Sequence, residues 1–522
     1  MTRAVIPLWA VITVVTATPP PVTVTRWVSP DSSRPGTFRD WYRTRPASKW
    51  CVRPITTAGV GFDDRVAVLV EETLLPSLRA SIDTLLSDLA RAGYQARAFA
   101  LSGTAPESLR AFLQAEYDSG LVAATLVGDL PIAWFQLLDD WNGNGVRDPD
   151  EDYEEFPCDL YFMDLDGIWQ DNWVRYDTFD SLVPGQDSIY DSHLGAVSPE
   201  IGITRLPVAT LGRSDSLLRL YFAKVHQYRT GQLTVTDRAL VYIDDDWFPW
   251  ALLWNNNVGL LYPDRVFIAD SEQTRVADYR PRIDTAAYQW LQLCAHSWPG
   301  GHALKFNHGQ HWDWFYATWI PGLNPEACFY NLFACSNVRF TETGYCGGRY
   351  VFQTATGLAA IGSTKTGSML EFQDYYGPLG SGAPIALAFK SWFAQQATGG
   401  FDSWERSWFY GMCQIGEALL QPRLQVAVGE PRPAQPLTLW TRPRPSPVRN
   451  RLRVELTLAA ATWVRIRLAD RAGRIIISLP AQLLGTGSHI ISLDVSRLAT
   501  GAYTLLVDAG MVRDRRTIVH IN

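Results

Sequence analysis

Apolar residues follow two spacings in the first part of the chain, and the two alternate. Residues 66–70 are a continuous apolar run, as in a strand covered on both faces of a sheet, and mainly apolar stretches at 96–101 and 121–127 predict two further strands. Between the first two runs, apolar residues recur at helical spacing, namely Ile82, Leu85, Leu86 and Leu89. Gly93 follows as the expected C-cap of this helix. Strand–helix–strand alternation predicts an α/β fold, with a parallel-type open sheet and helices on both of its faces.

The same alternation returns after residue 200. Further strands are predicted at 201–206, 239–243, 265–269, 288–294, 329–334 and 357–362, and helices at 216–228 and 385–396. Polar or small residues follow several of these strands: Asp244, Asp245, Asp246, Asp270, His296, Ser297, Cys335 and Ser336. Because ligands of open α/β sheets bind at the carboxyl ends of the strands, we expect these side chains to meet at one edge.

Near the C-terminus the apolar spacing changes to a period of two. The alternating residues are Leu452, Val454, Leu456 and Leu458, then Val464, Ile466 and Leu468. A further short strand begins near Ile490, and turn-forming residues lie between the strands. Several short strands close together predict a small antiparallel β-sandwich. A proline-rich stretch separates this sandwich from the α/β body.

These changes of pattern divide the chain into six segments. They are an apolar N-terminal segment (1–17), an aperiodic lead-in or pro-segment (18–62), an N-terminal α/β subdomain (63–235) and a second α/β subdomain (236–420). A proline-rich linker (421–447) and the sandwich (448–522) follow. The first segment has a basic start at Arg3, an apolar run and small residues near Ala17. This pattern indicates a secretory signal peptide, because the run is shorter than the ~20 residues that a spanning helix needs. A buried strand or a membrane anchor is the alternative. We expect no transmembrane helix in the mature chain.

Composition narrows the classes of function. Hydrophobic residues make up 47% of the 522 residues and charged residues 19%, which excludes disorder as the dominant state. The formal net charge of −7 supplies no basic field for nucleic acid. The seven cysteines are an odd number, so at least one thiol lacks a partner within the chain.

One loop matches the calcium-loop template at six positions in order. The five predicted ligands are Asp140, Asn142, Asn144, Asp148 and Glu151, and Gly145 occupies the glycine position. Hard oxygen ligands at alternate positions, a glycine for the sharp turn and a distal carboxylate are what Ca²⁺ requires. The alternative is an acidic surface loop. Because the flanks lack convincing helices and Pro149 lies inside the loop, we expect a structural calcium site that does not open and close.

Two further groups of residues have metal-binding chemistry. Four acids follow the calcium loop, and they either bind a second calcium ion or cap turns: Asp159, Asp164, Asp166 and Asp171. Four histidines lie close together in the second subdomain: His296, His302, His308 and His311. Their spacing does not match a helical zinc pair and no HExxH sequence is present, so zinc is not the favoured interpretation.

The pair His296 and Cys335 carries the strongest chemical hypothesis. Each follows a predicted strand, so both side chains are expected at the same sheet edge. A histidine near a thiol favours the nucleophilic thiolate and can later protonate a leaving amine. The alternative is that one residue is core filling or half of a disulfide. The pair together favours covalent catalysis.

Several blocks of the sequence resemble the gingipain-like cysteine peptidases, relatives of the caspases. In that family an apolar strand ends in His-Gly and a later apolar strand ends in Ala-Cys or Gly-Cys; Ala295-His296 and Ala334-Cys335 occupy those places. Other matching blocks are 126–129, 159–167, 203–207, 357–363 and the helix from Ile385. The resemblance covers about residues 63–420 and depends on block order more than on any one motif. It implies a caspase-like fold and a secreted cysteine endopeptidase.

The resemblance also implies roles for individual residues. Cys335 attacks the scissile carbonyl, His296 acts as acid and base, and the backbone amides of Ser297 and Cys335 form the oxyanion hole. Ser297 replaces the family's glycine, which is unfavourable if the backbone φ there is positive. The family suggests a carboxylate that orients the histidine. Asp244, Asp245 and Asp246 are candidates, and the sequence does not choose among them.

The last 80 or so residues resemble the C-terminal sorting domain of the type IX secretion system of Bacteroidetes-like bacteria. The matching pieces are 470–474, 487–489 and 498–503. This resemblance implies that the secretion machinery is a partner. With the signal peptide, it implies a secreted or cell-surface protein that acts on protein or peptide substrates. No organic cofactor is expected.

A second hypothesis is that the chain has the peptidase-like fold but no catalytic activity. The chain would then be a catalytically inactive, peptidase-like surface protein in adhesion or in glycan or protein binding, as its 21 tryptophans and the Ser297 departure suggest. Four tryptophans near the proposed site would instead line a substrate pocket in an enzyme: Trp298, Trp312, Trp314 and Trp319. Six cysteines are available for pairing in an oxidising compartment, which would leave Cys335 free: Cys51, Cys158, Cys294, Cys328, Cys346 and Cys413.

Overall fold

The computed structural model describes most of the chain. The described residues are 28–45, 48–59, 64–145, 148, 151–176, 182–233, 235–422, 440–444, 448, 451–458, 462–470, 475–479, 482–484, 487–509 and 512–520. The predicted signal peptide at 1–17 and most of the linker at 421–447 lie outside the described residues. Among the helices described, none combines the length and the apolar character needed to span a membrane.

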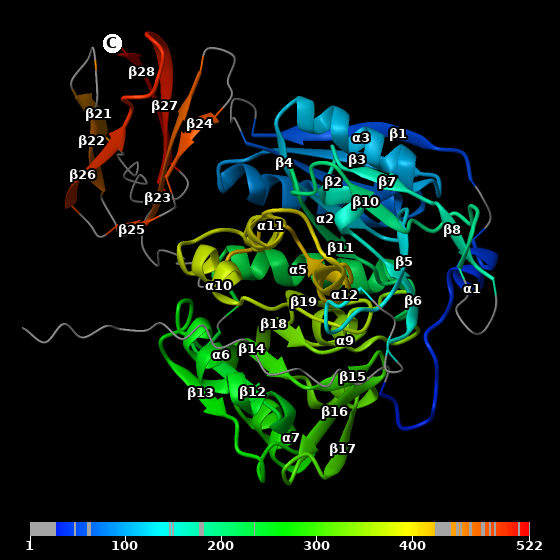
Figure 1. The fold of residues 1–522 in the computed structure, drawn as a ribbon. Coiled ribbons are helices and arrows are strands. Elements are labelled where there is room, and N and C mark those ends of the chain that lie inside the picture. The colour runs from blue at the N-terminus through cyan, green and yellow to red at the C-terminus, as the bar shows by residue number, and fades with distance from the viewer. Residues whose placement is uncertain are drawn as a thin grey trace, which may run out of the picture.

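A single 11-stranded sheet forms the centre of the α/β body (Figure 1). Its order is β1-β3-β2-β4-β11-β20-β19-β18-β14-β12-β13. The strands are β1 (Cys51–Ala58), β2 (Arg65–Glu71), β3 (Gln95–Ser102), β4 (Leu121–Val127), β11 (Gly202–Leu206), β12 (Ala239–Ile243), β13 (Arg265–Ile268), β14 (Tyr288–Cys294), β18 (Ala327–Phe333), β19 (Ala359–Ser363) and β20 (Met412–Gly416). Strands from both predicted subdomains therefore belong to one sheet.

The sheet is mixed because its two halves run in opposite directions. Strands β3, β2, β4, β11 and β20 are parallel to one another, and so are β19, β18, β14, β12 and β13. The direction reverses where β19 pairs antiparallel with β20. The carboxyl ends of β12, β14, β18 and β19 consequently meet at one edge, as the sequence predicted for the first three.

Nine strands of the 11-stranded sheet lie where the apolar runs predicted them, and the other two were missed. β20 received no prediction, although all of its residues are buried. β1 lies inside the stretch interpreted as an aperiodic lead-in, so that interpretation is wrong for residues 51–58. As an edge strand that pairs only with β3, it buries none of its side chains fully, and so it carries no apolar period.

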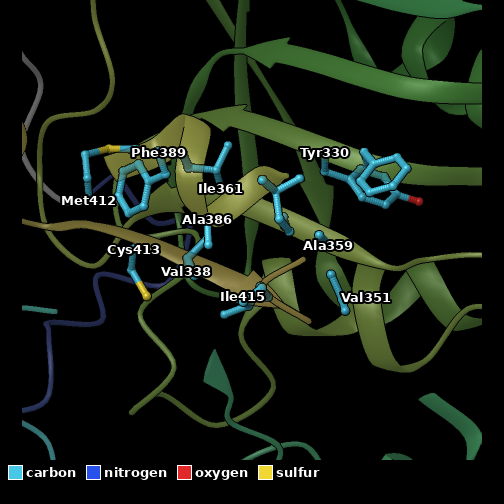
Figure 2. Close-up of a cluster of buried hydrophobic side chains, with 14 of the residues drawn as sticks. Tyr330, Val338, Val351, Ala359, Ile361, Ala386, Phe389, Met412, Cys413 and Ile415 are labelled. Carbon is cyan, nitrogen blue, oxygen red and sulfur yellow. The ribbon is translucent and has the colours of Figure 1, made fainter. Parts of the chain in front are cut away.

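Helices flank the sheet in two rows. One row of mutually contacting helices is α2 (Leu75–Arg91), α5 (Ser214–Arg229) and α9 (Cys346–Phe352), and the other is α11 (Ile385–Gln396), α10 (Gln373–Gly380) and α6 (Ala251–Val258). Figure 2 shows the core at the middle of the sheet, where Val351 of α9 and Phe389 of α11 lie near side chains of β18, β19 and β20. The remaining helices are α1 (Phe38–Arg43), α3 (Pro106–Asp118), α4 (Leu160–Met163), α7 (Val276–Thr285), α8 (Ile320–Leu323) and α12 (Ser403–Phe409), with short 3₁₀ turns at Glu72–Leu74, Asp245–Trp250 and Ala317–Trp319.

Small antiparallel sheets extend from the main one. A three-stranded sheet follows β14 and consists of β15 (His296–Trp298), β16 (Gly301–Phe306) and β17 (His311–Tyr316). Three two-stranded sheets pair β5 (Trp134–Leu138) with β6 (Tyr153–Pro157), β7 (Ile168–Gln170) with β10 (Ser192–Leu194), and β8 (Trp173–Arg175) with β9 (Leu182–Pro184).

The C-terminal part consists of two antiparallel sheets. One contains β21 (Trp440–Arg444), β22 (Arg451–Leu458) and β26 (Gly487–Asp494), and the other contains β23 (Thr462–Ala469), β24 (Ile475–Ser478), β25 (Gln482–Leu484), β27 (Gly501–Ala509) and β28 (Val512–His520). The alternating apolar residues of β22 and β23 are buried in a core that the two sheets share. This confirms the period-two prediction of a small antiparallel sandwich.

The cysteines do not pair in this structure, contrary to the possibility raised for six of them. All seven are free thiols, and five of them are buried: Cys158, Cys294, Cys328, Cys346 and Cys413. They occupy separate core positions; for example, Cys294 ends β14 whereas Cys328 lies near the start of the adjacent β18. The odd cysteine count therefore does not single out Cys335.

Candidate active site

Two neighbouring strands bring the histidine and the cysteine to the same edge of the sheet. In the parallel register of β14 and β18, Cys294 lies opposite Phe333. His296 and Cys335 each follow two residues later, so the register places them side by side. Both line one pocket. The rest of its wall is Trp247, Ala295, Phe333, Ala334, Gly367, Ser368 and Trp408.

Of the three candidate acids, only Asp246 bonds the histidine. Asp246 Oδ2 lies 2.8 Å from His296 Nε2 and 2.6 Å from Lys305 Nζ. The Asp244 carboxylate instead accepts hydrogen bonds from the backbone N–H groups of Lys305 (3.1 Å) and Asp246 (3.2 Å). Asp245 Oδ2 is buried without a hydrogen-bond partner. Burial favours a higher pKa for Asp246, but the hydrogen bonds from His296 and Lys305 outweigh it and hold this pKa below its ordinary value.

The imidazole of His296 is buried among aromatic rings. Trp247 and Trp312 lie 5.5 Å and 5.2 Å from it between ring centroids. Burial lowers the pKa of His296 below its ordinary value, and the bond to Asp246 opposes this. The ring is therefore neutral at pH 7. Because an ionised Asp246 accepts the Nε2 proton, Nδ1 is the basic nitrogen.

The backbone N–H of Gly367 favours the ionised form of the Cys335 thiol. Burial raises the pKa of Cys335 to about 11, and the Gly367 amide works against that rise. The thiol therefore keeps its proton at neutral pH. A thiolate forms only when a base takes this proton, and His296, which lines the same pocket, is a side chain able to do so.

Gly367 occupies a position where only glycine fits. Its φ is +106°, and a Cβ there would lie 2.7 Å from the carbonyl oxygen of Ser407 and 2.8 Å from that of Trp408. The loop after β19 thus holds an N–H group against the sulfur of Cys335. Gly367 was not among the predicted site residues, because nothing in the local sequence pattern distinguishes it from other loop glycines.

Ser297 introduces no backbone strain. It lies within β15, paired with His302, and its φ is not positive, unlike that of Ser336, where φ is +56°. The Ser297 hydroxyl donates a hydrogen bond to the carbonyl oxygen of Cys335. The serine therefore links the two strand ends, and the concern about a positive φ at this position does not apply.

A buried ionic cluster lies behind the cysteine. Lys365 Nζ lies 2.9 Å from Asp139 and 2.9 Å from Glu154, and all three side chains are shielded from solvent. Lys365 Nζ also donates to the carbonyl oxygens of Thr366 and Ser407. These bonds fix the loop that carries Gly367. Sequence reasoning missed this cluster because its members are far apart along the chain.

The calcium-loop residues are linked in one hydrogen-bonded turn. The Asp140 carboxylate accepts the N–H groups of Asn144 (3.1 Å) and Gly145 (3.0 Å), and Gly145 has a φ of +71°. Asp148 accepts from the side-chain amides of Asn142 and Asn144. Glu151 accepts from two backbone N–H groups, those of Trp141 and Asp148. The oxygen-rich side chains and the glycine turn fit a calcium loop, although the three carboxylates are not all within 4.8 Å of one another.

The four acids proposed for a second calcium site do not form one cluster. Asp159 forms a buried ion pair with Arg205, 2.7 Å apart, and Asp171 caps the N–H groups of Asp187 and Ser188. Asp164 and Asp166 lie close to Glu200, with their carboxylate oxygens within 4.8 Å of one another. Asp164 also bonds His193 and the N–H of Gly167.

The histidines do not form a zinc site. His302 is buried, bonds the hydroxyl of Tyr350 at 3.1 Å and has a pKa lowered to about 3 by burial. His308 and His311 are exposed. Within the described part of the chain, the one cluster of three acids, histidines or cysteines close enough to share a metal ion contains no histidine.

Comparisons with known proteins identify no family. No family model matches the sequence, and no curated protein matches it. Weakly similar solved structures include an endo-beta-1,4-mannanase from Thermotoga petrophila, with a TM-score of 0.12, 9% sequence identity and coverage of 62% of this chain and 79% of that one. An engineered protein has a TM-score of 0.12, 8% identity and coverage of 62% and 65%. TM-scores this low indicate no shared fold and carry no argument about function.

Proposed function

We propose that the protein is a secreted cysteine endopeptidase in which Cys335 and His296 form the catalytic dyad. The observation that carries this proposal is the register of β14 and β18, which ends in His296 and Cys335 lining one pocket. The Asp246–His296 bond orients the imidazole as such a dyad needs, and the Gly367 N–H favours the thiolate. The order of sequence blocks that resembles gingipain-like peptidases supports the same reaction class.

The reaction follows from the protonation states. The Cys335 sulfur bonds to the scissile carbonyl carbon while its proton passes to His296 Nδ1. The carbonyl oxygen becomes an oxyanion, which accepts hydrogen bonds from the backbone N–H groups of Ser297 and Cys335. The C–N bond then breaks, and His296 gives its proton to the leaving amine, which leaves a thioester on the enzyme. Water attacks the thioester as His296 takes a proton from it. The C–S bond breaks, the acid product departs and Cys335 regains its proton.

One observation favours the alternative of a catalytically inactive surface protein. The cavity between His296 and Cys335 has a volume of about 10 Å³, which is room for about one water molecule. His296 itself is 1% exposed. A substrate must therefore displace neighbouring side chains such as Trp247 and Trp408 before the thiol reaches a carbonyl. The two functions predict different outcomes for labelling of the thiol.

Covalent labelling with a library of peptidyl acyloxymethyl ketones tests the proposal. These probes react with a thiol that a neighbouring base activates. We expect stoichiometric labelling of the wild type, complete loss in Cys335→Ala, and loss in His296→Ala, which keeps the thiol but removes the base. Cys51→Ala is the matched control, because Cys51 is an exposed free thiol outside the site and its removal should change nothing. Labelling that persists in Cys335→Ala, or none under calcium and reducing conditions, would leave the inactive surface protein as the better description.

We propose further that the loop of Asp140, Asn142, Asn144, Asp148 and Glu151 holds a structural Ca²⁺. The donors are carboxylate and amide oxygens, which Ca²⁺ prefers, and the required glycine turn is present at Gly145. The ion would fix the turn between β5 and β6 and take no part in the reaction. Export through the signal peptide, with the C-terminal sandwich engaging the type IX secretion machinery, completes the proposal.

A further inference from the structure

One face of the small sheet that follows β14 carries the catalytic histidine and a row of aromatic side chains. Residues that pair directly across strands lie on the same face. The register pairs His296 with Ala303 and Ala303 with Trp314, then Trp298 with Gly301 and Gly301 with Tyr316, and Lys305 with Trp312. We call the surface formed by His296, Trp298, Trp312, Trp314 and Tyr316 the aromatic face.

The aromatic rings of this face touch one another and reach His296. Trp312 meets His296 edge-on at 5.2 Å and stacks on Trp314 at 5.9 Å between centroids. Trp298 packs edge-on against both Trp314 and Tyr316, at 5.6 Å and 5.9 Å. The rings therefore form one continuous apolar strip that begins at the catalytic imidazole.

The strip is partly open to solvent, whereas the opposite face of the same sheet is core. Trp312 and Trp314 are half-buried, and Tyr316 is 37% exposed. On the other face His302, Leu304 and Phe315 are fully buried. Several large aromatic side chains left partly exposed in a row are uncommon unless they bind something.

The backbone of the central strand is adapted to this face. Gly301 and Ala303 are the small residues between the aromatic rows, and a Cβ on Gly301 would lie 2.0 Å from the carbonyl oxygen of Phe315 and 2.8 Å from the indole ring of Trp298. Larger residues at these two positions would push the rings apart. The nearby cation, Lys305, is already paired with Asp246. The aromatic face therefore offers apolar contacts to a ligand, and the cross-strand pairs on this face include no carboxylate.

We propose that the aromatic face binds the part of the peptide substrate on the C-terminal side of the scissile bond, with a preference for apolar or aromatic residues there. This inference rests on the proposed peptidase function. His296 must protonate the leaving amine, so the residue that carries this amine lies against the imidazole. The strip that continues from His296 is then the surface over which the leaving segment runs.

The spacing of the rings suits an extended peptide. In a strand, side chains two residues apart lie on the same side and about 6.8 Å from each other. The Trp312–Trp314 centroid distance of 5.9 Å is close to this repeat. Alternate side chains of the leaving segment, the first and the third after the cut, thus meet successive rings.

Two sets of fluorogenic substrates test the inference. Both share one sequence before the cut; the first set ends in a coumarin amide, and the second continues with four residues whose first and third positions are Phe, Leu, Ala or Asp. We expect the wild type to prefer Phe and Leu over Asp in the second set. Trp314→Ala should reduce the ratio of kcat/KM between the Phe peptide and the coumarin substrate by about 10-fold, mainly through a higher KM. Trp314→Phe should restore most of this ratio.

The controls separate failure of this inference from failure of the proposed function. Tyr176→Ala removes a 75% exposed aromatic side chain outside the face and should leave all rates unchanged. If the wild type cleaves peptides with a flat preference, and Trp314→Ala leaves the ratio unchanged, the aromatic face does not bind the leaving segment. If no substrate is cleaved and no probe labels Cys335, the peptidase function itself fails. Quenching of tryptophan fluorescence by oligosaccharides, lost in Trp314→Ala while peptide rates stay the same, would assign the face to glycan instead.

Discussion

At the scale of single residues, burial determines how the proposed dyad works. It raises the pKa of Cys335 to about 11 and lowers that of His296, so both groups are neutral at pH 7. The pair is then not a preformed thiolate and imidazolium. In the proposed reaction, proton transfer would accompany the attack, and Asp246 would stabilise the imidazolium that results. Asp246, which bonds His296, is therefore expected to affect the rate strongly.

Asp246→Asn is expected to reduce kcat/KM by about 10²–10⁴-fold, because His296 loses the anion that holds its Nε2 proton. The wild type should stay active below pH 6.5 and lose activity as the pH falls through the lowered pKa of His296, where the base becomes protonated. Asp246 raises this pKa, so the acid limb of the variant should move to still lower pH. A pH profile of kcat/KM measures both effects.

Asp270→Asn is the matched control for this experiment. Asp270 also follows a strand of the sheet, but it caps the N–H of Glu272 and has no bond to His296. Its profile should match that of the wild type. If Asp246→Asn shows the same rate and the same acid limb as Asp270→Asn, Asp246 does not orient the histidine.

At the scale of elements, loops and a short helix connect the predicted calcium loop to the pocket. Asp140 accepts a hydrogen bond from Ser403 of α12, and its own N–H donates to Ser407 of the same helix. Ser407 also accepts a bond from Lys365, whose loop carries Gly367. An ion that orders the loop around Asp140 would therefore stabilise α12 and the neighbouring wall of the pocket.

Removing calcium is expected to destabilise the α/β body. At free calcium of about 100 times the Kd, the ion contributes about 2.7 kcal/mol, so a chelator should lower the melting temperature by several degrees. Asp140→Ala should abolish this response, whereas Asp171→Ala should retain it because Asp171 only caps a turn elsewhere. Differential scanning calorimetry with and without EGTA measures the shift. A response that survives in Asp140→Ala and disappears in Asp171→Ala would place the ion outside the proposed loop.

At the scale of the whole molecule, the described residues form two separate hydrophobic cores. One contains residues from Val66 to Leu420, and the other contains residues from Val448 to Ile518. The dyad, the calcium loop and the aromatic face all belong to the first. The sandwich buries its own apolar residues between its two sheets, as expected of a unit that folds by itself.

A chain that ends after residue 422 is expected to keep the stability and the labelling of the α/β body. Its melting temperature should agree with that of the main transition of the full chain to within about 2 °C. Labelling of Cys335 by the peptidyl probes should also persist. The isolated segment 440–522 should show its own cooperative transition by circular dichroism. A truncated body that aggregates or loses labelling would mean that the sandwich is needed for the body to fold.

Much of the secondary structure could be predicted because its cause is local. The predicted strands at 121–127, 239–243 and 288–294 and the helix at 385–396 have the bounds of β4, β12, β14 and α11. Buried strands of a parallel sheet are mostly apolar along their length, so each run is visible in the sequence alone. β1 has no such run because it is an exposed edge strand, and its place depends on pairing with β3.

For the candidate site, the sequence determined which two residues lie at strand ends, since His296 and Cys335 follow apolar runs. Only the tertiary structure decided the rest. It selected Asp246 from three adjacent acids, placed Lys305 and Gly367 beside the dyad, and showed that no cysteines pair. It also aligned Trp312, Trp314 and Tyr316 with His296 on one face. The physical reason is that most of these contacts join residues of different elements, and sequence periodicity specifies the face of an element but not which neighbour that face meets.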